Sequence, residues 1–200
     1  MATSSSRAYY VIVTRLKAAG LDFRSVVPDR PRAECDLIIT TSSESLRFGD
    51  KAVGLEDLSE NPGVFKGQIL SRLSGGEEVL VIGVDPGVRT GMAAFYGEVG
   101  LAFDVLWSVG DLRSRIAEFV RSVPAGKAVI RIGTGNLELA LKIARALSDE
   151  IPKTLVEMVN EAGTSGGSKT KGLQGDQEAA AKIAFRKGAA FTPASPRNQP

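Results

Sequence analysis

The sequence predicts an α/β protein built on a mixed β-sheet with helices on its faces. Residues 79–84 form a near-continuous apolar run, which is typical of a central strand covered on both faces. Two strand-like runs follow without an intervening helix, and helix-like and strand-like segments alternate after them. The 200 residues, 43% of them apolar, are enough for one large domain or two small ones.

Residues 1–74 predict a small α/β domain or an N-terminal extension. Ser4-Ser5-Ser6 is suited to cap a helix whose apolar stripe ends near Gly20. Strands are expected at 23–27, 35–40 and 51–55, followed by a helix at 63–73. Ser74-Gly75-Gly76 then interrupts the pattern, which predicts a domain boundary. We find no chemical motif in this part and expect it to serve in packing or in binding a partner.

Residues 77–188 predict the mixed sheet, with elements in the order β-β-β-α-β-α-β-α. The first three strands are expected at 79–84, 91–96 and 101–107, the last two joined by a hairpin at 97–100. The later pattern predicts a helix at 112–120, a strand at 128–132, a helix capped by Asn136, a strand at 154–159 and a helix at 176–187. The proline-rich residues 189–200 are expected to form a disordered tail.

The composition excludes several kinds of chemistry. The chain has no histidine and one cysteine, so Ser-His-Asp and Cys-His catalysis, histidine metal ligands and an internal disulfide are all excluded. Chemistry must use carboxylates, lysine, hydroxyls, the backbone or a hard metal ion. The net charge of +2 permits a nucleic-acid partner without arguing for one. No apolar stretch approaches 18 residues, so we expect a soluble, cytoplasmic protein with no membrane partner.

Three carboxylates stand at places where ligands collect in α/β sheets. Asp85 ends the predicted central strand, directly before a Pro-Gly turn, and Glu161 follows the strand at 154–159. Asp176 opens the last predicted helix. Each also has a purely structural explanation: support of a turn for Asp85, a solvated sheet edge for Glu161, and the helix dipole for Asp176.

Together with their neighbours, these residues resemble the RuvC/YqgF branch of the ribonuclease H-like superfamily over residues of about 77–190. The similar segments are Asp85-Pro86-Gly87 with Thr90-Gly91, Gly133-Thr134-Gly135-Asn136, Asn160-Glu161-Ala162-Gly163-Thr164-Ser165, and Asp176-Gln177-Glu178-Ala179-Ala180. The resemblance implies a ribonuclease H-like fold, whose element order is the one predicted above. RuvC resolvases carry a second aspartate in the last helix, where this chain has Ala179. They also carry a glutamate near the fourth strand, where this chain has Gly133-Thr134-Gly135. The three-carboxylate YqgF pattern is therefore the better match.

The predicted function is that of a Mg²⁺- or Mn²⁺-dependent nuclease acting on structured DNA or RNA. Two carboxylates about 4 Å apart repel by roughly 4 kcal/mol at an effective dielectric near 20, so three converging carboxylates call for a cation. An all-oxygen ligand set selects hard ions. We therefore expect Asp85, Glu161 and Asp176 to be both the metal ligands and the catalytic residues. The expected nucleic-acid contacts are Lys169, Lys171, Thr90, Thr134 and Asn136.

Two other functions remain open at this point. One is a nucleic-acid-binding module of the same fold that has no catalytic activity, whose binding would not depend on Mg²⁺ or on Asp85. The other is an ATP-binding protein of the actin/sugar-kinase type, in which Gly133-Thr134-Gly135 would hold a phosphate before a helix. Cutting a junction would further require a homodimer, which places two sites symmetrically.

Overall fold

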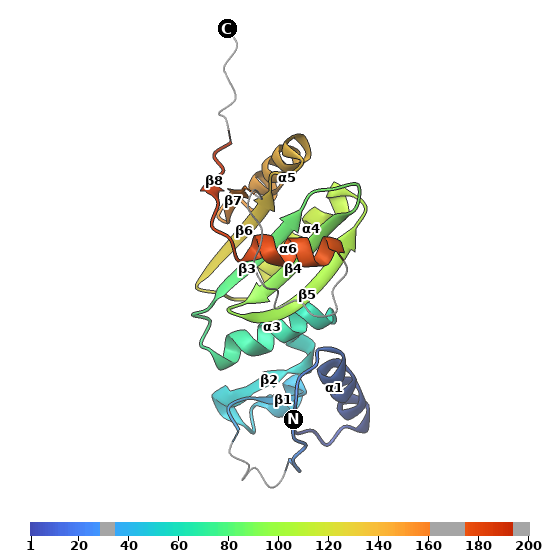
Figure 1. Cartoon of the computed structure of the whole chain (residues 1–200). Helices are drawn as coiled ribbons and strands as arrows, with labels where there is room; N and C mark the ends of the chain where they lie inside the picture. Colours follow the sequence, from blue (N-terminus) through green and yellow to red (C-terminus); the bar gives the residue numbers. More distant parts are fainter. Residues whose placement is uncertain (29–34, 161–174, 194–200) are drawn as a thin grey trace. The chain divides into compact units, whose positions relative to one another are not determined.

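The chain divides into two units, which are described separately here (Figure 1). The computed structural model describes residues 1–28, 35–160 and 175–193. The first unit comprises Met1–Glu77 with Ser122–Pro124, and the second comprises Glu78–Arg121 with Ala125–Pro200. Within the described ranges, no helix combines the length and the apolar character needed to cross a bilayer.

The first unit is a small α/β arrangement around two parallel strands, β1 and β2. Its regular elements are α1 (Ser6–Ala18), β1 (Ile38–Thr40), α2 (Ser42–Ser45), β2 (Ala52–Gly54) and α3 (Pro62–Leu73), with single 3₁₀ turns at Gly49–Lys51 and Leu55–Asp57. The Ser5 hydroxyl accepts a hydrogen bond from the amide of Ala8 and so caps α1, as the sequence predicts. Asn61 caps α3, with Pro62 in the first turn. The core includes the buried side chains of Ile12 and Phe65.

The prediction of a strand at 23–27 is wrong. Residues 21–27 have no regular secondary structure, although the amide of Val26 donates a hydrogen bond to the carbonyl of Met1. The apolar, β-branched composition of this segment is explained by packing: Leu21 and Phe23 lie against the core of the unit. The strands predicted at 35–40 and 51–55 exist in shorter form as β1 and β2.

The second unit contains the predicted mixed sheet. Its elements are β3 (Val79–Asp85), β4 (Thr90–Tyr96), β5 (Val99–Leu106), α4 (Val109–Ser122), β6 (Lys127–Gly133), α5 (Leu137–Glu150), β7 (Leu155–Val159), α6 (Gly175–Ala184) and β8 (Ala189–Ala190). The strand order in space is β5-β4-β3-β6-β7-β8. Strands β3, β6 and β7 are parallel, whereas β4, β5 and β8 run antiparallel to their neighbours. The α/β class, the mixed sheet and the order of elements are thereby confirmed.

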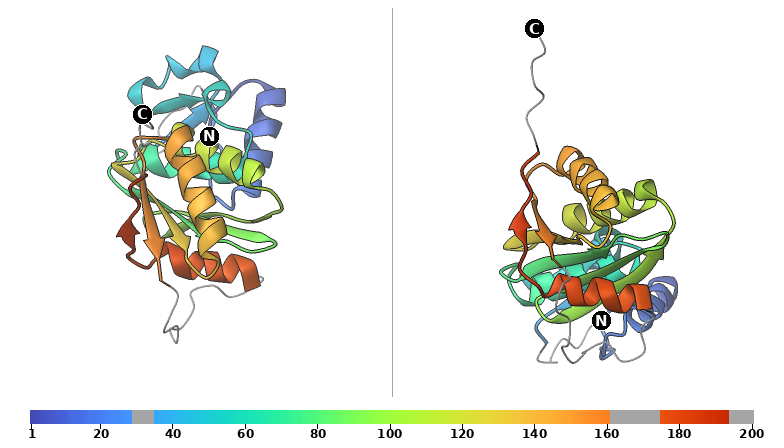
Figure 2. Two further views of the ribbon diagram at one scale, coloured as in Figure 1. Left: turned by 90° about the horizontal axis from the view of Figure 1, so that it is seen from above. Right: turned by 45° about the horizontal axis from the view of Figure 1, so that its top comes forward.

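Helices cover both faces of this sheet. Figure 2 shows α6 on one face and α4 and α5 on the other. Alternation along β3 explains the arrangement: Leu80, Ile82 and Val84 are fully buried on one face, while Val81 and Gly83 meet α6 on the other. The predicted near-continuous apolar run is therefore the consequence of burial on two sides.

Two differences from the sequence prediction lie near the C-terminus. Helix α6 ends at Ala184 and not at 187, because the amides of Phe185 and Arg186 donate to the carbonyl oxygens three residues earlier and not four. The Arg131 guanidinium donates to the carbonyl oxygen of Ala184 at 2.6 Å. The expected tail also begins with an ordered strand. Ala189 and Ala190 pair with Met158 and Glu157 as β8, because the edge of β7 offers free backbone groups for pairing.

Candidate functional site

The carboxyl ends of β3, β6 and β7 lie at one edge of the sheet, and Asp85 is the last residue of β3. The side chain of Asp85 belongs to the face that carries α6, because Gly83, two residues earlier, faces that helix. Gly91 lies directly opposite Asp85 on β4 and faces the same helix. Asp85 is half-buried at this position. In sheets of this kind, ligands bind in the crevice beyond the carboxyl ends of the strands.

The first turn of α6 brings Asp176 to the same place. A Cβ atom built on Gly91 would lie 2.0 Å from the backbone oxygen of Asp176, so the helix backbone rests directly on the strand. Because Gly91 is the partner of Asp85 in the β3–β4 ladder, the backbone of Asp176 lies against the strand position next to Asp85, on the same face of the sheet. The Gln177 side chain fixes this end of α6 by donating to the Phe103 carbonyl oxygen at 2.7 Å. Figure 1 shows α6 lying across the strands.

An arginine that the sequence analysis did not select completes this cluster. Arg89, in the loop between β3 and β4, forms an ion pair of 2.9 Å with Asp176. The side chains of Arg89 and Asp176 are 51% and 27% exposed, so the pair is open to solvent and to an approaching ligand. The signal for Arg89 was its place between Asp85 and Gly91, because a short hairpin loop brings all its residues to one edge of the sheet.

The other end of α6 is fixed by an ion pair between Arg131 and Glu157, which gives Glu157 a structural role. The Arg131 guanidinium donates to the Glu157 carboxylate at 2.8 Å and to the carbonyl oxygen of Ala184. Both side chains of this ion pair are largely buried, at 16% and 15% exposure. The Glu157 carboxylate also accepts a hydrogen bond from the amide of Gly188. The residue thus holds α6 and the segment after it against the sheet.

The remaining predicted residues have the following places. Glu161, Lys169 and Lys171 lie outside the described residues. Thr90 is buried, with its hydroxyl 3.5 Å from the Gly87 carbonyl oxygen, and the Thr134 hydroxyl donates to the Val159 carbonyl oxygen at 3.1 Å. The Asn136 side chain caps α5 by accepting from the amide of Leu139. The described contacts of the two threonines and of Asn136 are therefore structural.

The donor chemistry at this edge of the sheet fits a hard divalent cation. Among residues 1–28, 35–160 and 175–193, no group of three acidic, cysteine or histidine side chains is placed to hold a metal. Asp85 and Asp176 offer two carboxylates, and Mg²⁺ is commonly bound by one or two carboxylates together with water and substrate phosphates. The Arg89 guanidinium supplies positive charge beside Asp176, which lowers the cost of bringing a second carboxylate near it.

The first unit contains a polar cluster around Glu44 that the sequence analysis missed. The Glu44 carboxylate is 8% exposed and accepts hydrogen bonds from the hydroxyls of Thr3 (2.6 Å), Thr41 (2.9 Å) and Thr40 (3.2 Å). It also accepts from the amide and the hydroxyl of Ser4. These hydrogen bonds, those from Ser4 and Thr3 above all, hold the pKa of the Glu44 carboxyl well below its usual range. The hydroxyl-rich runs at 3–6 and 40–43 were the available signal.

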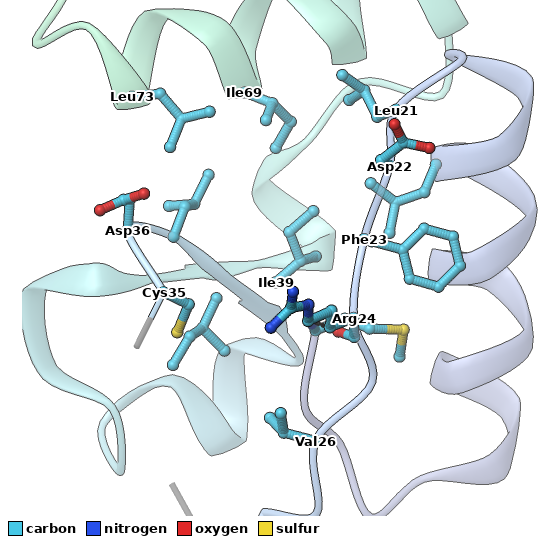
Figure 3. A pocket seen from close by; sticks show the side chains of 14 residues that line it. Leu21, Asp22, Phe23, Arg24, Val26, Cys35, Asp36, Ile39, Ile69 and Leu73 are labelled. Atoms are coloured by element: carbon cyan, nitrogen blue, oxygen red, sulfur yellow. Dashed lines mark hydrogen bonds between the residues drawn. The ribbon is translucent and has the colours of Figure 1, made fainter. Parts of the chain in front are cut away.

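A pocket of about 410 Å³ also lies in the first unit (Figure 3). Its walls come from α3, from β1 and from the segment after α1, and most of the side chains are aliphatic, such as Leu21, Ile39 and Ile69. Asp22, Arg24 and Asp36 contribute the charged side chains. This lining differs in kind from the carboxylate edge of the second unit, which shares no residue with it.

Comparison with known proteins adds no assignment to this geometry: no protein-family model, no curated protein and no solved structure matches the chain.

Proposed function

We propose that the second unit is a ribonuclease H-like domain that hydrolyses phosphodiester bonds in structured DNA or RNA with the help of Mg²⁺ or Mn²⁺. The observation that supports the proposal is the seat of α6 on Gly91: the backbone of Asp176 lies against the strand residue that pairs with Asp85, although the two aspartates are far apart in sequence. The order of elements, which is the order that the resemblance to the RuvC/YqgF branch implies, supports it further.

In this proposal Asp85 and Asp176 hold the cation, and Glu161, which follows β7 in the sequence, is the third ligand. The cation would polarise the phosphodiester and activate water for in-line attack, so that no histidine is needed. The backbone of Asp85 is held by the β3–β4 ladder and that of Asp176 by its seat on Gly91, and the ion pair with Arg89 orients the Asp176 carboxylate before substrate binds. Arg89 is placed to bind a phosphate oxygen when the cation takes over the neutralisation of Asp176.

The decisive experiment measures Mn²⁺ binding by calorimetry together with cleavage of single-stranded, duplex and branched substrates by the full chain. Asp85→Asn and Asp176→Asn should each remove Mn²⁺ binding and cleavage. Asp104→Asn is the matched control: Asp104 also pairs with an arginine, Arg115 at 2.8 Å, but it belongs to the face that carries α4. The control should keep both properties.

The outcomes separate the candidate functions. Cleavage retained by Asp85→Asn would reject the proposed site. Nucleic-acid binding that is the same with and without Mg²⁺, and unaffected by Asp85→Asn, would favour a module without catalytic activity. ATP binding without nucleic-acid binding would favour the phosphate-loop alternative at Gly133-Thr134-Gly135.

A further inference from the structure

Trp107 is a large aromatic side chain that lies mostly outside the packed core. It directly follows β5, it is 73% exposed, and it is the single tryptophan of the chain. The backbone after it is fixed, because the Ser108 hydroxyl accepts from the amide of Asp111 and donates to the Asp111 carboxylate. The indole is therefore presented to solvent from a rigid position at the start of α4.

Strand register places Trp107 at the edge of the sheet that carries the candidate site. Leu106 pairs with Thr90, and Asp85 pairs with Gly91, so β5 ends where β3 ends. Strands β5 and β3 are separated by β4 alone, which corresponds to about 10 Å between their ends. This is about the length of three stacked nucleotides at about 3.4 Å each.

The neighbours of Trp107 favour a polyanion with exposed bases as the occupant. Arg89 lies in the next loop, half-exposed, and Val88 beside it is 95% exposed. Carboxylates alone would repel a nucleic acid, so a strand that enters this edge needs attractive contacts close by. A guanidinium can bind its phosphates, and an indole can stack on the face of any unpaired base.

We propose that Trp107 is a stacking platform for an unpaired nucleobase next to the carboxylate site, and that the second unit therefore prefers substrates with single-stranded or splayed nucleotides. The inference rests on the proposed function, whose substrate class it narrows. Stacking on an aromatic side chain does not depend on base identity, so little sequence preference is expected.

The test uses Trp107 as its own reporter, since no other tryptophan contributes to the fluorescence. The full chain is titrated, with Ca²⁺ in place of Mg²⁺ or Mn²⁺ so that the carboxylates are neutralised, with oligothymidylate of about 12 nucleotides and with a duplex of the same length. Tryptophan fluorescence should fall in a saturable manner with the single strand. Anisotropy of a labelled oligonucleotide should show binding weakened on the order of tenfold in Trp107→Ala and largely restored in Trp107→Phe. Tyr10→Ala, at an equally exposed 73% position in the first unit, is the control and should bind normally.

The inference would be overturned if Trp107→Ala bound the single strand with unchanged affinity. It would also be overturned if the tryptophan fluorescence did not change as the oligonucleotide was added. Its failure is distinguishable from that of the proposed function. The stacking platform alone is rejected if Trp107→Ala still cleaves in the presence of the metal and the fluorescence of the unsubstituted protein is not quenched by the oligonucleotide. Saturable quenching without any cleavage rejects the nuclease and keeps the platform. No binding to either oligonucleotide rejects the stacking platform, and only the absence of cleavage on single-stranded, duplex and branched substrates rejects the nuclease.

Discussion

Replacing Gly83 by alanine should lift α6 from the sheet. A Cβ atom at this position would lie 2.0 Å from the backbone oxygen of Ala180, 2.6 Å from the backbone nitrogen of Ala184 and 2.8 Å from the Ala184 methyl group. The obstacle is the backbone of two successive helical turns, which no rotamer change can clear. The helix must therefore move by about 1 Å or more to reach ordinary contact distance.

The magnitude follows from this geometry. Overpacking of a well-packed core costs typically about 1–3 kcal/mol, and a backbone obstacle puts Gly83→Ala at the upper end, about 3 kcal/mol. With a slope of about 2 kcal/mol per molar urea, the unfolding midpoint of the second unit should fall by about 1.5 M. The assay is urea unfolding followed by circular dichroism, with hydrogen exchange of the α6 amides to show where protection is lost.

Gly110→Ala is the matched control for this prediction. Gly110 lies in the first turn of α4, and a Cβ atom there would meet nothing closer than 3.7 Å. The control should stabilise the protein by up to about 1 kcal/mol, since alanine restricts the unfolded chain. If Gly83→Ala unfolds within about 0.5 kcal/mol of the unsubstituted protein, the seat of α6 on β3 is not as close as described and the argument for the site fails with it.

Three further predictions follow from buried polar groups and a helix cap. Glu44→Gln should destabilise the first unit by about 2 kcal/mol at neutral pH, because hydroxyl and amide donors then face a neutral group. Since the pKa of Glu44 is lower in the folded than in the unfolded state, its contribution to stability is complete above about pH 5 and is lost as the pH falls. Measurements of unfolding free energy at decreasing pH should show this loss in the original protein and not in Glu44→Gln. An equal loss in both proteins would contradict the prediction. Arg131→Met should lower the free energy of unfolding by about 3 kcal/mol, because it leaves the buried Glu157 carboxylate without its cation. In thermal unfolding, the double variant with Glu157→Leu should recover most of that stability. No recovery would argue against the ion pair as the cause. Asn136→Ala should cost about 1 kcal/mol in urea unfolding and Asn136→Ser much less, and equal effects would show that the cap on α5 is not what matters.

The sheet of the second unit could be predicted because its local and long-range signals agree. The apolar run of β3 has the length of a buried strand, the stripes of α4 and α5 recur at the helical spacing, and the structure uses each as expected. The segment at 23–27 misled the prediction because a strand and an irregular segment packed on a core have the same apolar composition. A strand also needs a backbone partner, which composition does not reveal.

The end of α6 and the existence of β8 could not be predicted locally. The amides after Ala184 bond three residues back, and the carbonyl oxygen of Ala184 accepts a hydrogen bond from Arg131, 53 positions earlier. Ala189 and Ala190 have low strand propensity and pair only because β7 offers an open edge. For the site, Asp85 and Asp176 could be chosen from the sequence as residues at a strand end and a helix start. Their common face could not, since it depends on the contact between Gly91 and the helix backbone.

The seat of α6 has a consequence for how this molecule could diversify. At Gly83 and Gly91 the strand lies directly against the backbone of the helix, so the distance between the two layers at these positions leaves no room for a side chain. Any enlargement at Gly83 or Gly91 would widen that gap and, in the same movement, draw Asp176 away from Asp85. The packing of α6 on the sheet and the geometry of the proposed site therefore depend on the same two glycines, and a substitution that alters one alters the other.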